Sequence, residues 1–328
     1  MRNFNLPFYS LSALATVYAQ NKSELSSEFD ERKKYKTTKE KIFNFRERHG
    51  IPGVSVCVTK GSKVVYNEGI GYSNVELKRK VSPDHLFRIA SISKPLTSIL
   101  FGTLVDRKIA NFSDNLVSLF KNEYEQLKGR KITPLNILNH TSGIRHYEDN
   151  EFKSSEHYND TKSALEKFIN SPLLFKSGSK FSYSTYAFTL LARSIEIYHE
   201  KHYKQEVSFE HLLGNLFLKL GLFNTTIDDN KTIINGRVQH YTRNKKGILE
   251  NAVHVDCSYK YAGGGILSSA RDLCYFGDHL ASIYLGKIND GIVSYDTLSK
   301  LWTISNIEMP KRFFPLNRMC ANGWFLAK

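Results

Sequence analysis

The order of apolar and polar residues predicts a strand hairpin near residue 53. Residues 53–59 alternate small or polar with apolar side chains, residues 60–62 signal a turn, and residues 63–68 return as a second strand. A helix is predicted just before the hairpin, beginning near Thr38 and ending before Gly50. Its apolar positions are Ile42, Phe43 and Phe45. Two antiparallel strands packed against a helix indicate an α+β fold.

From Leu86 onward the apolar positions follow a helical period. One broad apolar face predicts a helix that begins around Ser91 and runs to about Arg107. Thr133 and Pro134 predict the start of another helix. Its predicted stop is Gly143, and further helices are expected over residues 185–200, 208–220, 269–281 and 295–302.

Three segments complete the predicted layout. Residues 145–171 are polar and are interpreted as a surface insertion. The apolar stretch at residues 322–327 predicts a final strand, which is expected to join the hairpin in one sheet lobe. Residues 1–22 carry Arg2 and no acid, which is typical of a targeting segment for secretion or for mitochondria, or of a disordered N-terminus. A single domain is expected over residues 36–328.

Composition narrows the function classes. The chain has 328 residues, 46 Lys plus Arg against 32 Asp plus Glu, and 41% hydrophobic residues, which is globular composition. The basic residues are dispersed among acids and are not interleaved with stacking aromatics, so nucleic-acid binding is not indicated. The charge of +14 supports at most a loose contact with anionic membranes or substrates.

The four cysteines stand far apart. Cys57, Cys257, Cys274 and Cys320 form no Cys-x-x-Cys pair and have no zinc-ligand spacing with His. They are interpreted as four separate thiols, mostly buried as small apolar side chains. No stretch is apolar and long enough to predict a membrane span.

The pattern Ser-x-x-Lys is the first candidate for chemistry. Residues three apart at a helix start share a face, so the amine can reach the serine hydroxyl. The pattern occurs three times, at Ser91/Lys94, Ser118/Lys121 and Ser177/Lys180. Only Ser91 follows an apolar run into an amphipathic helix, whose positive end favours negative charge at Ser91 and disfavours a charged Lys94. Ser91 alone is therefore either a nucleophile or a helix N-cap.

Tyr183 stands at a second predicted helix start. From there its hydroxyl can relay protons, and the alternative is an ordinary half-buried aromatic residue. His140 and His146 are interpreted as helix-end or loop packing residues rather than members of a triad. Residues 263–265 are three glycines without the spacing of a phosphate-binding loop.

Four motifs together carry a family resemblance. They are RIASISK at 88–94, HTSGIRHY at 140–147, YST at 183–185 and SYKYAGGG at 258–265. In this order they resemble the serine beta-lactamase and penicillin-binding-protein family, in its class C-related branch. Within that branch the mitochondrial beta-lactamase-like proteases of animals are most similar, and the similarity runs from about Glu47 to Ala327.

The resemblance implies a fold and a site. It implies an antiparallel sheet lobe and a helical lobe with Ser91 at their junction. It implies that Ser91 is the acylated nucleophile, Lys94 its base and Tyr183 the hydroxyl that exchanges protons with the leaving group. Thr185 would bind substrate at a position where many relatives carry Asn. No metal or cofactor is implied.

The function implied is a serine hydrolase, a peptidase in a mitochondrial compartment. Its substrate would be a peptide or a small amide or ester. Two alternatives stay open, namely a non-catalytic scaffold that forms homo-oligomers or filaments, and a secreted esterase-like or lactonase-like paralogue. The family's third motif, Lys/His-Thr/Ser-Gly, and the strands and helix after it do not occur before Lys328. The chain is accordingly expected to be a fragment of an active enzyme or a truncated, inactive relative.

Overall fold

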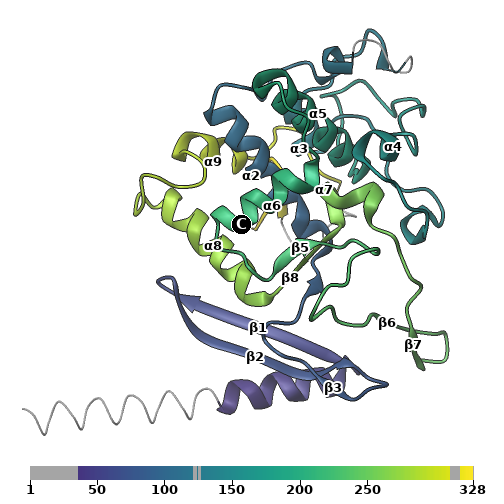
Figure 1. The fold of residues 1–328 in the computed structure, drawn as a ribbon, viewed down its shortest axis with the longest axis vertical. Coiled ribbons are helices and arrows are strands. Elements are labelled where there is room, and N and C mark those ends of the chain that lie inside the picture. The colour runs from purple at the N-terminus through teal and green to yellow at the C-terminus, as the bar shows by residue number, and fades with distance from the viewer. Residues whose placement is uncertain (1–35, 121–123, 125–126, 311–317, 328) are drawn as a thin grey trace, which may run out of the picture.

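The fold was analysed in a computed structural model that describes residues 36–120, 124, 127–310 and 318–327. A strand hairpin lies on one side of the molecule and a mostly helical body on the other (Figure 1). The predicted α+β class is confirmed. The predicted segment 1–22 lies outside the described residues.

The hairpin forms as its alternation predicts. Strand β1 (Gly53–Lys60) pairs antiparallel with β2 (Lys63–Asn74), and β3 (Arg79–Lys80) adds to β2, giving the order β1-β2-β3. The turn needs left-handed backbone, which Gly61 supplies with φ 58°. The predicted helix occupies residues 36–48 and lies beneath this sheet (Figure 1), while α8 (Ala270–Tyr284) packs on β1 from the other side.

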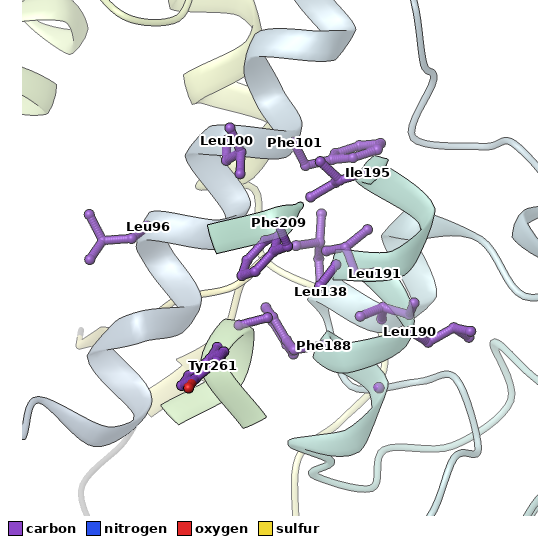
Figure 2. Packing of buried hydrophobic residues seen from close by; sticks show 14 of the residues in the cluster. Leu96, Leu100, Phe101, Leu138, Phe188, Leu190, Leu191, Ile195, Phe209 and Tyr261 are labelled. Carbon is purple, nitrogen blue, oxygen red and sulfur yellow. The ribbon is translucent and has the colours of Figure 1, made fainter. Parts of the chain in front are cut away.

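The helical body is built around two long buried helices, α2 (Ser93–Asp106) and α5 (Tyr186–Tyr203). Figure 2 shows their apolar side chains meeting those of α6 (Phe209–Lys219). Leu96, Phe188 and Phe209 are fully buried in this cluster. The described residues also form the α-helices α3 (Pro134–Leu138), α4 (Thr161–Leu165), α7 (Tyr261–Gly264) and α9 (Tyr295–Leu301). They form the short 3-10 helices η1 (Ala90–Ile92), η2 (Leu116–Phe120), η4 (Glu151–Lys153) and η5 (Ser258–Lys260) as well.

The predicted helices are confirmed with small shifts of their ends. Helix α3 begins at Pro134 behind a Thr133 cap, as expected, but it ends at Leu138 and not at Gly143. His140 adopts left-handed backbone with φ 58°, which stops the helix before the glycine is reached.

A small internal sheet leads into the site. Its order is β4-β8-β5, formed by β4 (Phe87–Arg88), β8 (Ile266–Ser268) and β5 (Thr225–Ile227). Strand β4 runs directly into the segment that carries Ser91, and β8 directly follows the three glycines. Pairing of β4 with β8 therefore brings these two distant motifs together. A separate hairpin pairs β6 (Tyr241–Arg243) with β7 (Leu249–Asn251).

The interpretation of residues 145–171 as a surface insertion is wrong in part. Helix α4 lies inside this stretch, and Leu165, Phe168 and Ile169 are buried in the core. Only Leu165 lies on α4, while Phe168 and Ile169 lie in the turn that follows it, so these buried residues show no helical or strand period in the sequence.

The expected joining of the last strand to the hairpin sheet is also wrong for the described residues. Strand β10 (Phe325–Ala327) pairs antiparallel with β9 (Arg318–Cys320) in a separate two-stranded sheet. The short connection favours this local pairing, which a hydrogen bond from the Ala321 N–H to the Trp324 carbonyl closes at 2.9 Å. The Gly323 N–H also donates to the Leu138 carbonyl at 2.7 Å, which ties this end to the helical body.

The four cysteines are free thiols. Cys257 and Cys320 are buried as predicted, whereas Cys57 and Cys274 are only partly buried. Within the described residues, no helix combines the length and the apolar character that crossing a membrane requires.

Candidate active site

Ser91 lies on a strained turn at the start of α2. Ala90, just before it, has φ 47°, a left-handed conformation that costs energy for a residue with a Cβ. Ser91 is exposed, whereas the residues of α2 that follow are mostly buried. The turn thus holds the serine hydroxyl at the surface of a rigid helix end.

Lys94 lies one turn further and is only 2% exposed. Its Nζ donates to the carbonyl oxygen of Gly263 at 2.6 Å and lies 3.3 Å from both Ser91 Oγ and Thr185 Oγ1. The ring centroids of Tyr183 and Phe188 lie 4.8 and 5.3 Å from Nζ. The described contacts of this amine are therefore neutral oxygens and aromatic faces.

This environment disfavours the charged form of Lys94. Burial lowers its pKa to about 7, and the positive charge of Lys260 acts in the same direction. A lysine amine near its pKa at neutral pH is partly unprotonated and can accept a proton.

Tyr183 completes a chain of three polar groups. Its hydroxyl lies 2.6 Å from Ser91 Oγ. Burial raises the pKa of Tyr183, although hydrogen bonds from Ser91 and Thr185 oppose the shift, so the phenol keeps its proton. The structure thus brings the predicted residues Ser91, Lys94 and Tyr183 together.

Two histidines hold the backbone beside Tyr183. The Ser184 N–H donates to His140 Nδ1 and the Thr185 N–H donates to His146 Nδ1, both at 3.3 Å. The His140 ring also packs on the Tyr183 ring, with centroids 4.3 Å apart. Burial, followed by the charge of Lys94, lowers the pKa of both rings, to about 4 for His146. Both are neutral acceptors that position Tyr183, which agrees with the predicted packing role.

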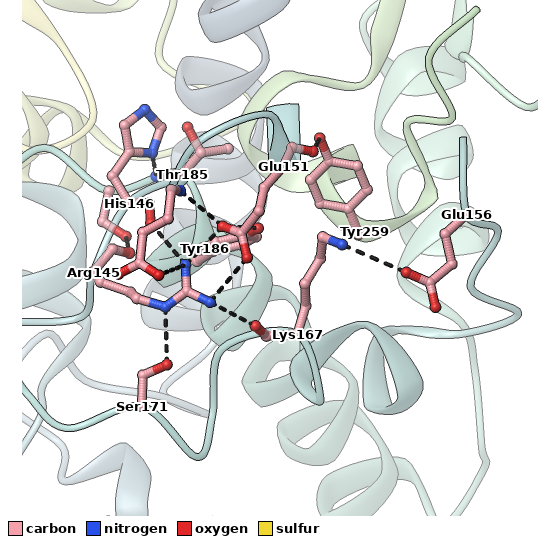
Figure 3. Close-up of polar contacts among 11 residues, drawn as sticks. Arg145, His146, Glu151, Glu156, Lys167, Ser171, Thr185, Tyr186 and Tyr259 are labelled. Carbon is pink, nitrogen blue, oxygen red and sulfur yellow. Dashed lines mark hydrogen bonds and ion pairs between the residues drawn. The ribbon is translucent and has the colours of Figure 1, made fainter. Parts of the chain in front are cut away.

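An ion pair that sequence reasoning missed supports His146. Arg145 pairs with Glu151 at 2.7 and 3.1 Å and also donates to the Lys167 carbonyl and to Ser171 Oγ (Figure 3). Tyr186, the first residue of α5, donates its hydroxyl to Glu151 at 3.0 Å. The pair therefore ties the loop of His146 to the helix that follows Tyr183. Its sequence signal was the arginine within the motif at 140–147.

Thr185, the predicted substrate-binding residue, is 3% exposed and turns its hydroxyl toward Lys94. The aromatic residue Phe325 of β10 lies near this hydroxyl chain, with its ring centroid 6.3 Å from that of Tyr183. A role for Thr185 in binding substrate stays a prediction.

The contact between the Gly263 carbonyl and Lys94 is a second feature that sequence reasoning missed, because every residue has a backbone carbonyl and a motif does not single one out.

We expect Gly263→Ala to lower the free energy of unfolding by about 1–3 kcal/mol. The added Cβ would lie 2.5 Å from Thr185 Cγ2 and 3.0 Å from the Thr185 carbonyl oxygen, so the start of α5 must move. Urea unfolding checks the loss.

Gly264→Ala is the matched control in the same helix. Its added Cβ would meet nothing nearer than the Ala90 carbonyl carbon at 3.9 Å, so its stability is expected to stay close to that of the parent chain. An equal loss in both variants would contradict the close packing of Gly263 on Thr185.

No cluster of three or more His, Cys, Asp or Glu side chains that suits a metal ion occurs within residues 36–120, 124, 127–310 and 318–327. The groups that meet at Ser91 are a serine hydroxyl, a buried amine with a lowered pKa and a protonated phenol. Such a set can form a covalent acyl intermediate and move the protons that its formation requires.

Known proteins are similar to this chain over most of its length. The family model described as Beta-lactamase matches residues 38–327. The human protein "Serine beta-lactamase-like protein LACTB, mitochondrial" is 29% identical in an alignment that covers 83% of this chain. The chain spans 63% of the length of that relative.

Solved structures share the fold at low identity. The octameric penicillin-binding protein homologue from Pyrococcus abyssi has a TM-score of 0.72 at 22% identity, covering 88% of this chain and 64% of its own. The D-amino acid amidase from Ochrobactrum anthropi SV3, complexed with L-phenylalanine amide, has a TM-score of 0.72 at 18% identity, covering 90% and 81%. The predicted fold, a beta-lactamase and transpeptidase-like α+β arrangement, is confirmed.

Proposed function

This chain belongs to the beta-lactamase family of serine hydrolases, and from that premise we propose that it cleaves peptides through an acyl-enzyme on Ser91. The observation that carries the proposal is the contact chain from Tyr183 through Ser91 to Lys94, with steps of 2.6 and 3.3 Å. A nucleophile within hydrogen-bond reach of a base and of an acid is what acyl transfer requires.

In the acylation step, Ser91 Oγ attacks the carbonyl carbon and passes its proton to the neutral Lys94 amine. The backbone N–H of Ser91 would stabilise the negative charge on the carbonyl oxygen. Tyr183 gives its proton to the leaving nitrogen as the amide bond breaks, and the proton on Lys94 restores the phenol. Water then attacks the acyl carbon, and the released serine regains its proton.

The state of Tyr183 supports an amide substrate. An amine leaves an acyl centre only after its nitrogen has gained a proton, whereas an ester oxygen leaves more easily. The raised pKa of Tyr183 keeps a proton 2.6 Å from Ser91 Oγ, where a leaving nitrogen would need it. The human relative carries the word mitochondrial in its name, and we propose a mitochondrial location on that likeness.

A substrate panel tests the proposal. The purified chain is incubated with a mixture of unmodified peptides and, separately, with an activated phenyl ester, and the products are read by mass spectrometry. New peptide ends are the expected result. Turnover of the ester alone would favour the esterase-like alternative, and turnover of neither would favour the non-catalytic scaffold.

The pH dependence follows from Lys94. Only the unprotonated amine accepts the serine proton, so activity is expected to rise with pH and to reach half its plateau near the Lys94 pKa of about 7. The measurement is kcat/KM for the ester between about pH 5 and 9. If kcat/KM is still rising at the upper end of that range, the result would contradict a base with a lowered pKa.

A further inference from the structure

Two thiols outside the site meet where α8 packs on the strand hairpin. Cys57 lies on β1 and Cys274 on α8, separated by 217 positions in the chain. The Sγ of Cys274 lies 3.4 Å from the Cys57 carbonyl oxygen. Figure 1 shows α8 lying along β1, so the two cysteines belong to elements that are packed together.

The side chains around Cys57 show which face of α8 it meets. Cys274, Arg271 and Asp278 all act on the pKa of the Cys57 thiol, so the three residues lie close to it. These three residues of α8 are spaced three and four apart, so they share one face of the helix. Cys57 therefore lies against that face, on which Cys274 stands between Arg271 and Asp278 and contacts the Cys57 backbone.

Solvent exposure distinguishes Cys57 and Cys274 from the other two cysteines. Cys57 and Cys274 are both partly exposed, whereas Cys257 and Cys320 are 2% and 3% exposed. A small oxidant can reach the first two thiols without unfolding the chain.

We propose that Cys57 and Cys274 are a redox modification site that closes into a reversible disulfide with a small disulfide oxidant, of which oxidised glutathione is the example. One of the two cysteine thiolates attacks a sulfur of the oxidant, forming a mixed disulfide and releasing one glutathione thiolate. The other cysteine thiolate then attacks the protein sulfur of that mixed disulfide and releases the second. Two protein thiols are oxidised, one oxidant disulfide is reduced to two thiols, and the protons go to solvent or to the released glutathione.

The surroundings of Cys57 set the rate of disulfide formation. Burial and the adjacent Cys274 thiol raise the pKa of Cys57 to about 12, so its thiolate is scarce at neutral pH. Whichever thiol attacks first, one of the two attacks is made by the Cys57 thiolate, so disulfide formation is expected to accelerate as pH rises. Closure ties β1 to α8 and constrains a long stretch of unfolded chain.

The test uses the purified chain treated with oxidised glutathione and then with an alkylating reagent. We expect a cross-linked proteolytic peptide that contains Cys57 and Cys274 and is lighter by two hydrogen atoms, while Cys257 and Cys320 stay reduced. The unfolding temperature is expected to rise by about 5 °C or more on oxidation and to return on reduction.

Cys57→Ser and Cys274→Ser each remove one partner conservatively and are expected to abolish both the cross-link and the temperature shift. Cys257→Ser serves as the matched control and is expected to keep both. A stable glutathione adduct on Cys57 or Cys274 without the internal cross-link would overturn the proposal, as would a cross-link to Cys257 or Cys320. The proposal is independent of catalysis, so an inactive chain would leave it standing.

Discussion

Ser91→Ala is expected to reduce hydrolysis of an activated ester by about ten-thousand-fold or more. The variant removes the atom that forms the acyl bond, whereas the strained turn at Ala90 and the buried Lys94 can stay in place. The Ser91 side chain is exposed, so the unfolding temperature is expected to change little. The measurement is kcat/KM of the variant and the parent chain, with thermal unfolding of both.

The chain supplies its own controls for this experiment. Ser118 and Ser177 stand in the same Ser-x-x-Lys pattern but donate to the carbonyl oxygens of Asn115 and Ser142 instead of meeting Tyr183. Ser118→Ala and Ser177→Ala should keep the activity of the parent chain. Loss of activity in either control, or its persistence in Ser91→Ala, would remove Ser91 from the proposed mechanism.

Lys94→Met is expected to lower the same rate by about a thousand-fold. Methionine keeps much of the buried apolar volume beside Phe188 but cannot take the serine proton. It also leaves the Gly263 carbonyl and the Thr185 hydroxyl without their contact to Nζ, so a loss of about 1–3 kcal/mol in unfolding free energy is expected.

Lys260→Met separates the amine's role from that of local charge. Lys260 donates to the Phe152 carbonyl at 3.3 Å and acts on Lys94 through its charge. Because the Lys260 charge helps to lower the pKa of Lys94, Lys260→Met should move the rise of activity to higher pH and keep most of the plateau rate.

If Lys94→Met retained the parent's plateau rate, Lys94 would not be the base.

Periodicity was sufficient to predict most of the fold. The hairpin at residues 53–68 and the helix starting at Pro134 follow from alternation and from local capping, which depend on residues close in sequence. The buried part of residues 161–169 was missed because a single helical turn presents too few apolar positions to show a period. The pairing of β10 with β9 was missed although the two strands are close in sequence, because residues 318–320 are too few to show the alternation of a strand.

Some features of the candidate site could be predicted from the sequence and others could not. The reactive side chains Ser91, Lys94 and Tyr183 could be selected from motifs and from the family resemblance. The Gly263 carbonyl could not, because every residue carries one and only the fold aims this one at Lys94. The low pKa of Lys94 likewise depends on burial that the motif does not state.

The most direct test of the central claim is covalent labelling with a fluorophosphonate, which reacts with activated serine hydroxyls. The chain is treated with the probe near neutral pH, weighed intact, and digested to locate the adduct. The mechanism predicts one adduct per chain, on Ser91, forming more slowly as pH falls below the Lys94 pKa of about 7. A folded chain that gains no adduct, or gains it on another serine, would contradict the assignment of Ser91 as the nucleophile.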